Sequence, residues 1–411
     1  MECPAPPRIP YLLAGEPAGD PVPSFRFSDS IDAFHARASE ARSLDDFGED
    51  DYREALAVLC RSLDDDANLS PLGEIGLQTM IVDALEARLL CEEGWRRYPE
   101  AAETQIERPL VIIGLPRTGT TALHHLMAQD PDVQAMDHWL MRTPKPRPPR
   151  AEWEADLDYQ AAAARVDLMF ARSPDMRAIH EIEAFLPDEC WNVFSQNFLH
   201  SSYEANADVR GYAEWWAHAD LRPVYARHAR NAQLIGSTTP EKRWIFKDAT
   251  HLFGPEALFE TYPDAMIVQT HRDPVPMIAS VCSLCWSSRN AMNEGTDRAT
   301  FGESTLALWE RSINSMMEAR KNRDPAQFYD LPFERFVTDP IGAIRDIYAY
   351  FGLPYTDEAE AAIHRFRKAN PKGKHGAHHY TLAEYGLDET EVRERFQRYT
   401  DAYGDVGARP A

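Results

Sequence analysis

The segment Gly114-Leu-Pro-Arg-Thr-Gly-Thr-Thr121 combines residue types that bind an anion. It follows a short apolar run at 109–113 and leads into a pattern that predicts a helix over Thr120–Ala128. Backbone N–H groups at such a strand-to-helix junction, together with the helix dipole, form a nest for phosphate-like groups. Arg117 adds a guanidinium that can pair with two oxygens at once. The segment therefore predicts a site for a phosphate or sulfate group.

This loop differs from the ATP-binding P-loop, GxxxxGK[ST], at the position that matters most for magnesium-dependent chemistry. In the P-loop the Lys contacts the β- and γ-phosphates and the following Ser or Thr holds the metal. Here the two glycines keep their spacing, but Thr120 stands where that Lys should be. Val268-Gln269-Thr270 supplies no Asp at the end of the strand predicted at 265–269. A P-loop kinase or NTPase is therefore a disfavoured alternative.

A second strand-to-helix junction lies at 265–280. Arg272 follows the strand predicted at 265–269, and Pro274 suits the first turn of a helix. Ser280 comes eight residues after Arg272, slightly more than two helical turns, so it faces back toward the strand end. Arg and Ser together predict a site for a second phosphate.

These two motifs, in this order, resemble those of the sulfotransferases that use 3′-phosphoadenosine-5′-phosphosulfate (PAPS). The string GLPRTGTTALHHLM is similar to the bacterial branch, and the resemblance covers roughly 108–380. It implies that a sulfuryl group is transferred to a hydroxyl of a small acceptor. No pair of carboxylates follows the strands at Gly114 or Gln269 to hold an ion, so we expect this transfer to need no metal. The resemblance also implies a site for the 5′-phosphosulfate at Arg117, Thr118, Gly119, Thr120 and Thr121, and one for the 3′-phosphate at Arg272 and Ser280.

A basic segment at 364–379 contrasts with the acidic chain around it. It carries five Lys or Arg residues and four His residues. The family closes over its nucleotide with a basic, Gly-containing loop, so the resemblance assigns Lys372 and Lys374 to the 3′-phosphate. A solvated basic surface is the alternative.

Sulfuryl transfer to an alcohol also needs a base for the hydroxyl proton and a cation near the bridging oxygen. The segment WIFKDATHL resembles a family strand that ends in Lys-Thr-His-Leu, which implies Lys247 as the cation and His251 as the base. Two extra residues separate Lys from His here. His180 is a rival base, and Glu183 and Glu189 are further candidates. The choice of base stays open.

The elements that position these residues alternate between strand and helix. Strands are predicted at 109–114, 244–247, 265–269 and 327–331, with a helix at 339–351. This alternation predicts an α/β fold, a three-layer parallel sheet with a P-loop-like nucleotide site. Helical periodicity before residue 98 predicts an N-terminal arm and helical subdomain, 1–107, ahead of an α/β domain, 108–411. A helical insertion at about 142–240 would form a lid or acceptor pocket.

Composition limits the possible partners. The chain has 411 residues, of which 43 are basic and 66 acidic, giving a net charge of −23. Such a surface repels polyanions, so nucleic acid is not an expected partner. No apolar stretch approaches the length of a membrane span, and the first residues do not resemble a signal peptide, so we expect a cytoplasmic protein. The oligomeric state stays open.

Cysteines and aromatic residues give weaker indications. Six scattered cysteines do not predict a disulfide framework, and Cys282 and Cys285 are interpreted as lying on a buried helix face. We expect no metal site.

The insertion is rich in aromatic side chains, which fits a hydrophobic acceptor. A nucleotide-binding protein without catalysis is a further alternative.

Overall fold

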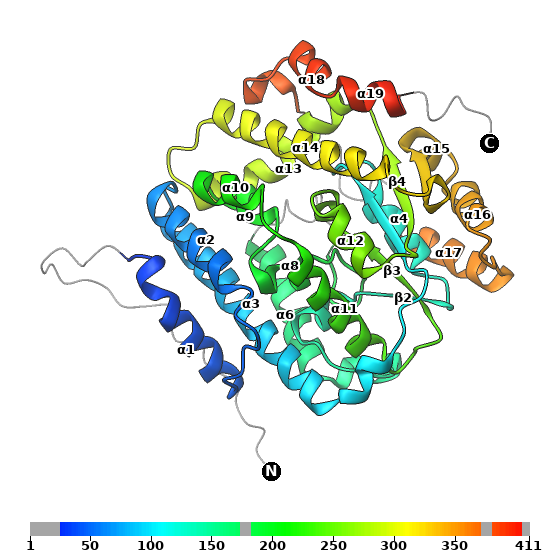
Figure 1. The fold of residues 1–411 in the computed structure, drawn as a ribbon, viewed down its shortest axis with the longest axis horizontal. Coiled ribbons are helices and arrows are strands. Elements are labelled where there is room, and N and C mark those ends of the chain that lie inside the picture. Colours follow the sequence, from blue (N-terminus) through cyan, green and yellow to red (C-terminus); the bar gives the residue numbers. More distant parts are fainter. Residues whose placement is uncertain (1–24, 173–181, 371–379, 405–411) are drawn as a thin grey trace, which may run out of the picture.

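The computed structural model describes residues 25–172, 182–370 and 380–404, and a five-stranded parallel sheet lies at its centre (Figure 1). The strand order is β2-β3-β1-β4-β5. The strands are β1 (Leu110–Gly114), β2 (Val133–Ala135), β3 (Arg243–Lys247), β4 (Met266–His271) and β5 (Phe328–Pro332). The four strands expected from the sequence are confirmed. Strand β2 was missed because it is only three residues long.

Helices cover both faces of the sheet, which confirms the three-layer α/β fold. Because side chains alternate across a strand, Leu110 and Ile112 pack into one core while Val111 and Ile113 pack into the other. The first core is closed by α4 (Thr120–Met127), α15 (Phe333–Thr338), α16 (Pro340–Tyr350) and α17 (Asp357–Ala369). The second is closed by α11 (Arg222–Gly236), α12 (Pro255–Thr261), α13 (Pro274–Met292) and α14 (Arg298–Arg320).

The N-terminal helices belong to the second core. They are α1 (Ile31–Arg42), α2 (Arg53–Asp65) and α3 (Pro71–Arg97), and they lie in the region before residue 98 where helices were expected. Helix α3 packs tightly on the end of α13, where a Cβ on Gly73 would lie 1.9 Å from the carbonyl oxygen of Met292. Their buried apolar residues form one continuous cluster with those of the sheet. The boundary expected at 107 is therefore not a break in packing.

Short helices occupy the predicted insertion and the C-terminal end. They are α5 (His138–Arg142), α6 (Leu157–Arg172), α8 (Trp191–Phe194), α9 (Ser202–Asn206), α10 (Arg210–Trp216), α18 (Glu389–Arg395) and α19 (Gln397–Tyr403). Helix α9 lies beside α13, and α10 packs against α2 (Figure 1). None of the helices in the described ranges has both the length and the apolar composition needed to span a bilayer.

Candidate active site

The strand order brings three predicted site segments to one edge of the sheet. The Gly114–Thr121 loop follows β1, the central strand, while Lys247 ends β3 and Arg272 follows β4. Strands β3 and β4 pair with β1 on either side, and all three are parallel. Their carboxyl ends therefore lie together, where ligands bind in open α/β sheets.

The loop after β1 is held in a conformation that ordinary residues seldom adopt. Gly119 has a φ of 90° at the start of α4, and Arg117 has a φ of 65° in the left-handed region. A non-glycine residue with such a φ is uncommon, and strained residues of this kind cluster at active sites and ligand clamps. The Thr118 hydroxyl donates to the Leu115 carbonyl oxygen at 2.6 Å and also contacts the Thr270 hydroxyl at 2.6 Å. Thr118 thus shapes the loop, with its hydroxyl turned inward.

The two predicted phosphate motifs are in direct contact. Arg117 Nε donates to Ser280 Oγ at 3.2 Å, which joins the loop to α13. Arg272 Nη1 donates to the Arg117 carbonyl oxygen at 2.7 Å, and its guanidinium lies 4.2 Å from the centre of the Phe333 ring. Segments more than 150 residues apart in the chain therefore form one cationic surface.

Lys247 connects this surface to a carboxylate. Its side chain is 3% exposed, and Nζ donates to Thr121 Oγ1 at 2.8 Å. The same ammonium forms an ion pair with Glu189, whose side chain is 25% exposed. Thr121, Lys247 and Glu189 thus form a chain of polar groups that runs away from the loop.

This chain opens into a cavity of about 220 Å³. The cavity is lined by Arg117, Thr120 and Thr121 of the loop, by Glu189, and by residues of the insertion, α13 and α14. Of the aromatic side chains, Trp309 of α14 lines it, and none of the tryptophans and phenylalanines of the insertion does. This lining was not predicted, because α13 and α14 lie outside the predicted insertion.

His251, expected as a base, is not placed in this cavity. It is completely buried, with Nδ1 2.7 Å from the Tyr225 hydroxyl and its ring 5.2 Å from that of Phe194. After Lys247 the chain turns into the short 3-10 helix η5 (Ala249–Leu252), where Asp248 Oδ1 accepts from Thr250 N at 2.7 Å. The two extra residues between Lys and His form this turn, and they direct Asp248 rather than His251 toward the cavity.

The remaining predicted site residues are one histidine, two lysines and two glutamates. His180, Lys372 and Lys374 lie outside the described residues. Glu183 is half-buried and does not line the cavity, whereas Glu189 does.

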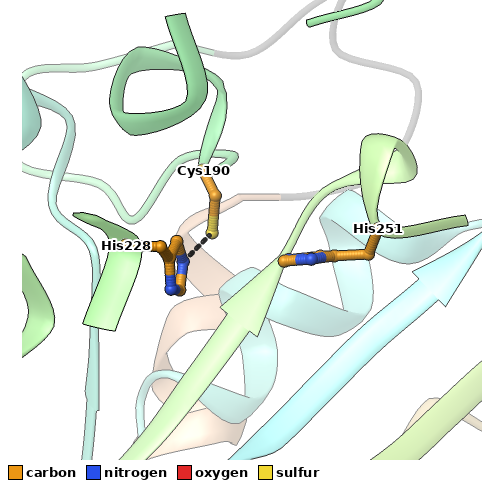
Figure 2. Close-up of side chains that lie close together, drawn as sticks. All are labelled: Cys190, His228 and His251. Atoms are coloured by element: carbon orange, nitrogen blue, oxygen red, sulfur yellow. Dashed lines mark hydrogen bonds between the residues drawn. The ribbon is translucent and has the colours of Figure 1, made fainter. Parts of the chain in front are cut away.

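The described residues contain one group of side chains that could hold a metal ion, namely Cys190, His228 and His251 (Figure 2). Their potential ligand atoms lie within 4.8 Å of one another, and the Cys190 thiol and His228 Nε2 are 3.2 Å apart. Burial lowers the pKa of both imidazoles and raises the pKa of the thiol. The S–H can therefore donate to neutral His228. Sequence patterns do not indicate this group, because its members come from three distant segments.

We expect His251→Gln to change the pH dependence of stability. Burial lowers the pKa of His251 from 6.5 to about 4. The unfolded chain therefore binds this proton first, and the free energy of unfolding falls as the pH drops through that range. The loss is about 1.4 kcal/mol per pH unit for one proton. Urea unfolding at several pH values should show a shallower dependence in the variant, and an unchanged dependence in exposed His218→Gln. If both variants matched the wild type, His251 would not titrate as a core residue.

Comparison with known proteins identifies the class. The model of the sulfotransferase family matches residues 109–357. The chain therefore belongs to the sulfotransferase family, and the enzyme class expected from the sequence is confirmed.

Individual relatives agree with this assignment. Sulfotransferase STF1 of Mycobacterium tuberculosis is 40% identical with a TM-score of 0.84, and the match covers 90% of this chain and 99% of that structure. Sulfotransferase STF9 of Mycobacterium avium is 25% identical with a TM-score of 0.84, covering 93% and 98%. The omega-hydroxy-beta-dihydromenaquinone-9 sulfotransferase Stf3 of Mycobacterium bovis is 26% identical over 61% of this chain. The match spans 65% of that relative's length.

Proposed function

We propose that this protein transfers the sulfuryl group of PAPS to a hydroxyl of a small acceptor, without a metal ion. The observation that carries the proposal is the contact between the two anion-binding motifs, in which Arg117 Nε donates to Ser280 Oγ at 3.2 Å. A nucleotide with anionic groups at both the 5′ and the 3′ position fits such a pair of adjoining sites.

Each site has its own residues in this proposal. Arg117, Thr120, Thr121 and the backbone N–H groups at the start of α4 hold the 5′-phosphosulfate. Arg272 and Ser280 hold the 3′-phosphate, and Lys372 and Lys374 remain proposed contributors to it.

A magnesium-dependent kinase is the less suitable alternative. Thr120 stands where a P-loop carries Lys. Asp248, the carboxylate at the end of β3, is already engaged by Thr250 N and by His200 Nε2 at 3.4 Å. Burial opposes its ionisation, but the imidazole and the backbone bond outweigh burial and lower its pKa to about 2. In this proposal the cations Arg117 and Lys247 neutralise the charge that magnesium neutralises in a kinase.

Glu189 is the base that the geometry favours. Of the proposed bases that lie in the described residues, Glu189 alone lines the cavity, and its carboxylate contacts Lys247. In the proposed step Glu189 takes the proton of the acceptor hydroxyl, and the hydroxyl oxygen forms a bond to sulfur. The bond between sulfur and the 5′-phosphate oxygen breaks, and its electron pair leaves with adenosine 3′,5′-bisphosphate. Lys247 and Arg117 stabilise the charge that develops on the bridging oxygen.

The cavity supports a partly hydrophobic acceptor. Leu284, Leu308 and Trp309 line it. The name of the relative Stf3 gives that protein an omega-hydroxylated menaquinone as substrate. We take from this relative only the acceptor class, a hydroxyl on a largely apolar molecule.

Arg272→Ala is the experiment that tests the proposed donor. The variant should bind adenosine 3′,5′-bisphosphate about tenfold to hundredfold more weakly, because a hydrogen-bonded charge on the 3′-phosphate is lost. Its affinity for adenosine 5′-phosphosulfate, which lacks that phosphate, should hardly change. Arg335→Ala is a matched control, because Arg335 is paired with Asp339 and Asp346. Equal losses for both nucleotides would contradict the assignment of Arg272.

A further inference from the structure

Arg289 is a buried cation that forms no ion pair within the described residues. The residue is 5% exposed and lines the cavity, and its Nη1 has no hydrogen-bond partner. No described carboxylate lies within 4.0 Å of its guanidinium, and its aromatic neighbour, Phe301, has its ring centre 5.5 Å away. Burial lowers its pKa, but an arginine stays protonated in proteins. A positive charge is therefore held at low exposure without an ion pair in the described residues.

The two carboxylates that share the cavity with Arg289 have arginines of their own. Glu204 pairs with Arg311 at 3.1 Å, and Asp208 pairs with Arg210 at 3.6 Å. Both carboxylates lie beyond ion-pair distance from Arg289, but the negative charge of each raises the pKa of the Arg289 guanidinium. A buried charge without a partner is costly, so its persistence beside a cavity indicates that a ligand supplies the missing anion.

Arg289 lies at the end of the cavity remote from the loop. Val281, Cys285 and Arg289 follow one another at four-residue spacing along α13, so they share one face of the helix. Eight residues correspond to a rise of about 12 Å. Cys285 lies between the two ends. Burial raises the pKa of its thiol to about 11, and the charges of Arg289, Arg117 and Glu189 also influence that pKa. The apolar side chains Leu284 and Leu308 line the intervening space.

We propose that Arg289 binds a carboxylate at the end of the acceptor opposite to its reacting hydroxyl. This inference rests on the proposed sulfuryl transfer and names its substrate class: a hydroxylated carboxylic acid with an apolar middle. The guanidinium fork matches both oxygens of a carboxylate. A doubly charged phosphate is less suitable, because Glu204 and Asp208 would repel it more strongly.

The test compares 10-hydroxydecanoate with its methyl ester, a neutral analogue of the same length, at saturating PAPS. The wild type should prefer the acid by about tenfold or more in kcat/KM, the effect of one charge-assisted contact. Arg289→Gln should lose this preference through a fall for the acid alone. Arg298→Gln is the matched control, because Arg298 is an exposed arginine that pairs with Glu384 and does not line the cavity, and it should keep the preference.

Two further measurements keep the inference separate from the proposed function. Calorimetric titration with decanoate, which has no hydroxyl, should show binding to the wild type and a loss of about tenfold or more in Arg289→Gln. The melting temperature of Arg289→Gln should not fall, because the substitution removes an unpaired buried charge. Equal kcat/KM for acid and ester would overturn the inference, and so would decanoate binding that is unchanged in Arg289→Gln. Formation of sulfated product would still support the proposed function in either case. Failure of PAPS to sulfate either compound, with decanoate binding still dependent on Arg289, would count against the proposed function alone.

Discussion

Glu189→Gln is expected to lower kcat by about 100-fold to 10,000-fold, the range for loss of a general base. Gln keeps the shape of the side chain and can still bond to Lys247, but it cannot take the hydroxyl proton. Affinity for adenosine 3′,5′-bisphosphate should stay close to that of the wild type, since Glu189 lies on the cavity side of Lys247. Steady-state kinetics and calorimetry on the same preparation measure the two effects.

Glu183→Gln is the matched control for this prediction. It removes a nearby carboxylate of the same segment that does not line the cavity, so kcat should be nearly unchanged. A large loss in Glu183→Gln with full activity in Glu189→Gln would move the base away from Glu189.

Arg117→Ala should reduce turnover by about 100-fold or more, the effect of removing one charge contact made in the transition state. The guanidinium belongs to a ligand loop, so the melting temperature should change little. Arg117→Lys should recover part of the rate, because it restores the charge without the planar fork. Single-turnover measurements separate this effect from nucleotide binding.

A control is needed because Arg117 also has an unusual backbone conformation. Arg108 shares a positive φ, 43°, but lies at the other end of β1, where its side chain donates to the Phe351 carbonyl oxygen. Arg108→Ala should therefore keep its activity. An Arg117→Ala variant with more than about a third of wild-type activity would contradict the role of this arginine.

Local patterns were enough to predict most of the sheet and the nucleotide motifs. The apolar run before Gly114 and the two strand-to-helix junctions are each encoded within a few residues. Local patterns of this kind predicted β1, β3, β4 and β5. Strand β2 was not, because Val133–Ala135 is too short to show a period.

The choice of base depended on tertiary structure. His251 follows a strand that ends in Lys, but the turn after Asp248 buries it among aromatic rings. Glu189 and Lys247 are 58 residues apart, and only the folded chain brings them together. Arg289 carried no signal in the sequence either. Its significance comes from burial and from the pairing of Glu204 and Asp208 with other arginines.

The most direct test of the central claim is calorimetric titration of the full chain, in excess EDTA, with adenosine 3′,5′-bisphosphate. A parallel titration uses ATP with magnesium in place of EDTA. The sites at Arg117 and at Arg272 with Ser280 together predict tight, metal-free binding of the bisphosphate and little binding of ATP with magnesium. Binding of ATP that depends on magnesium, with no binding of the bisphosphate, would contradict the account and favour a kinase.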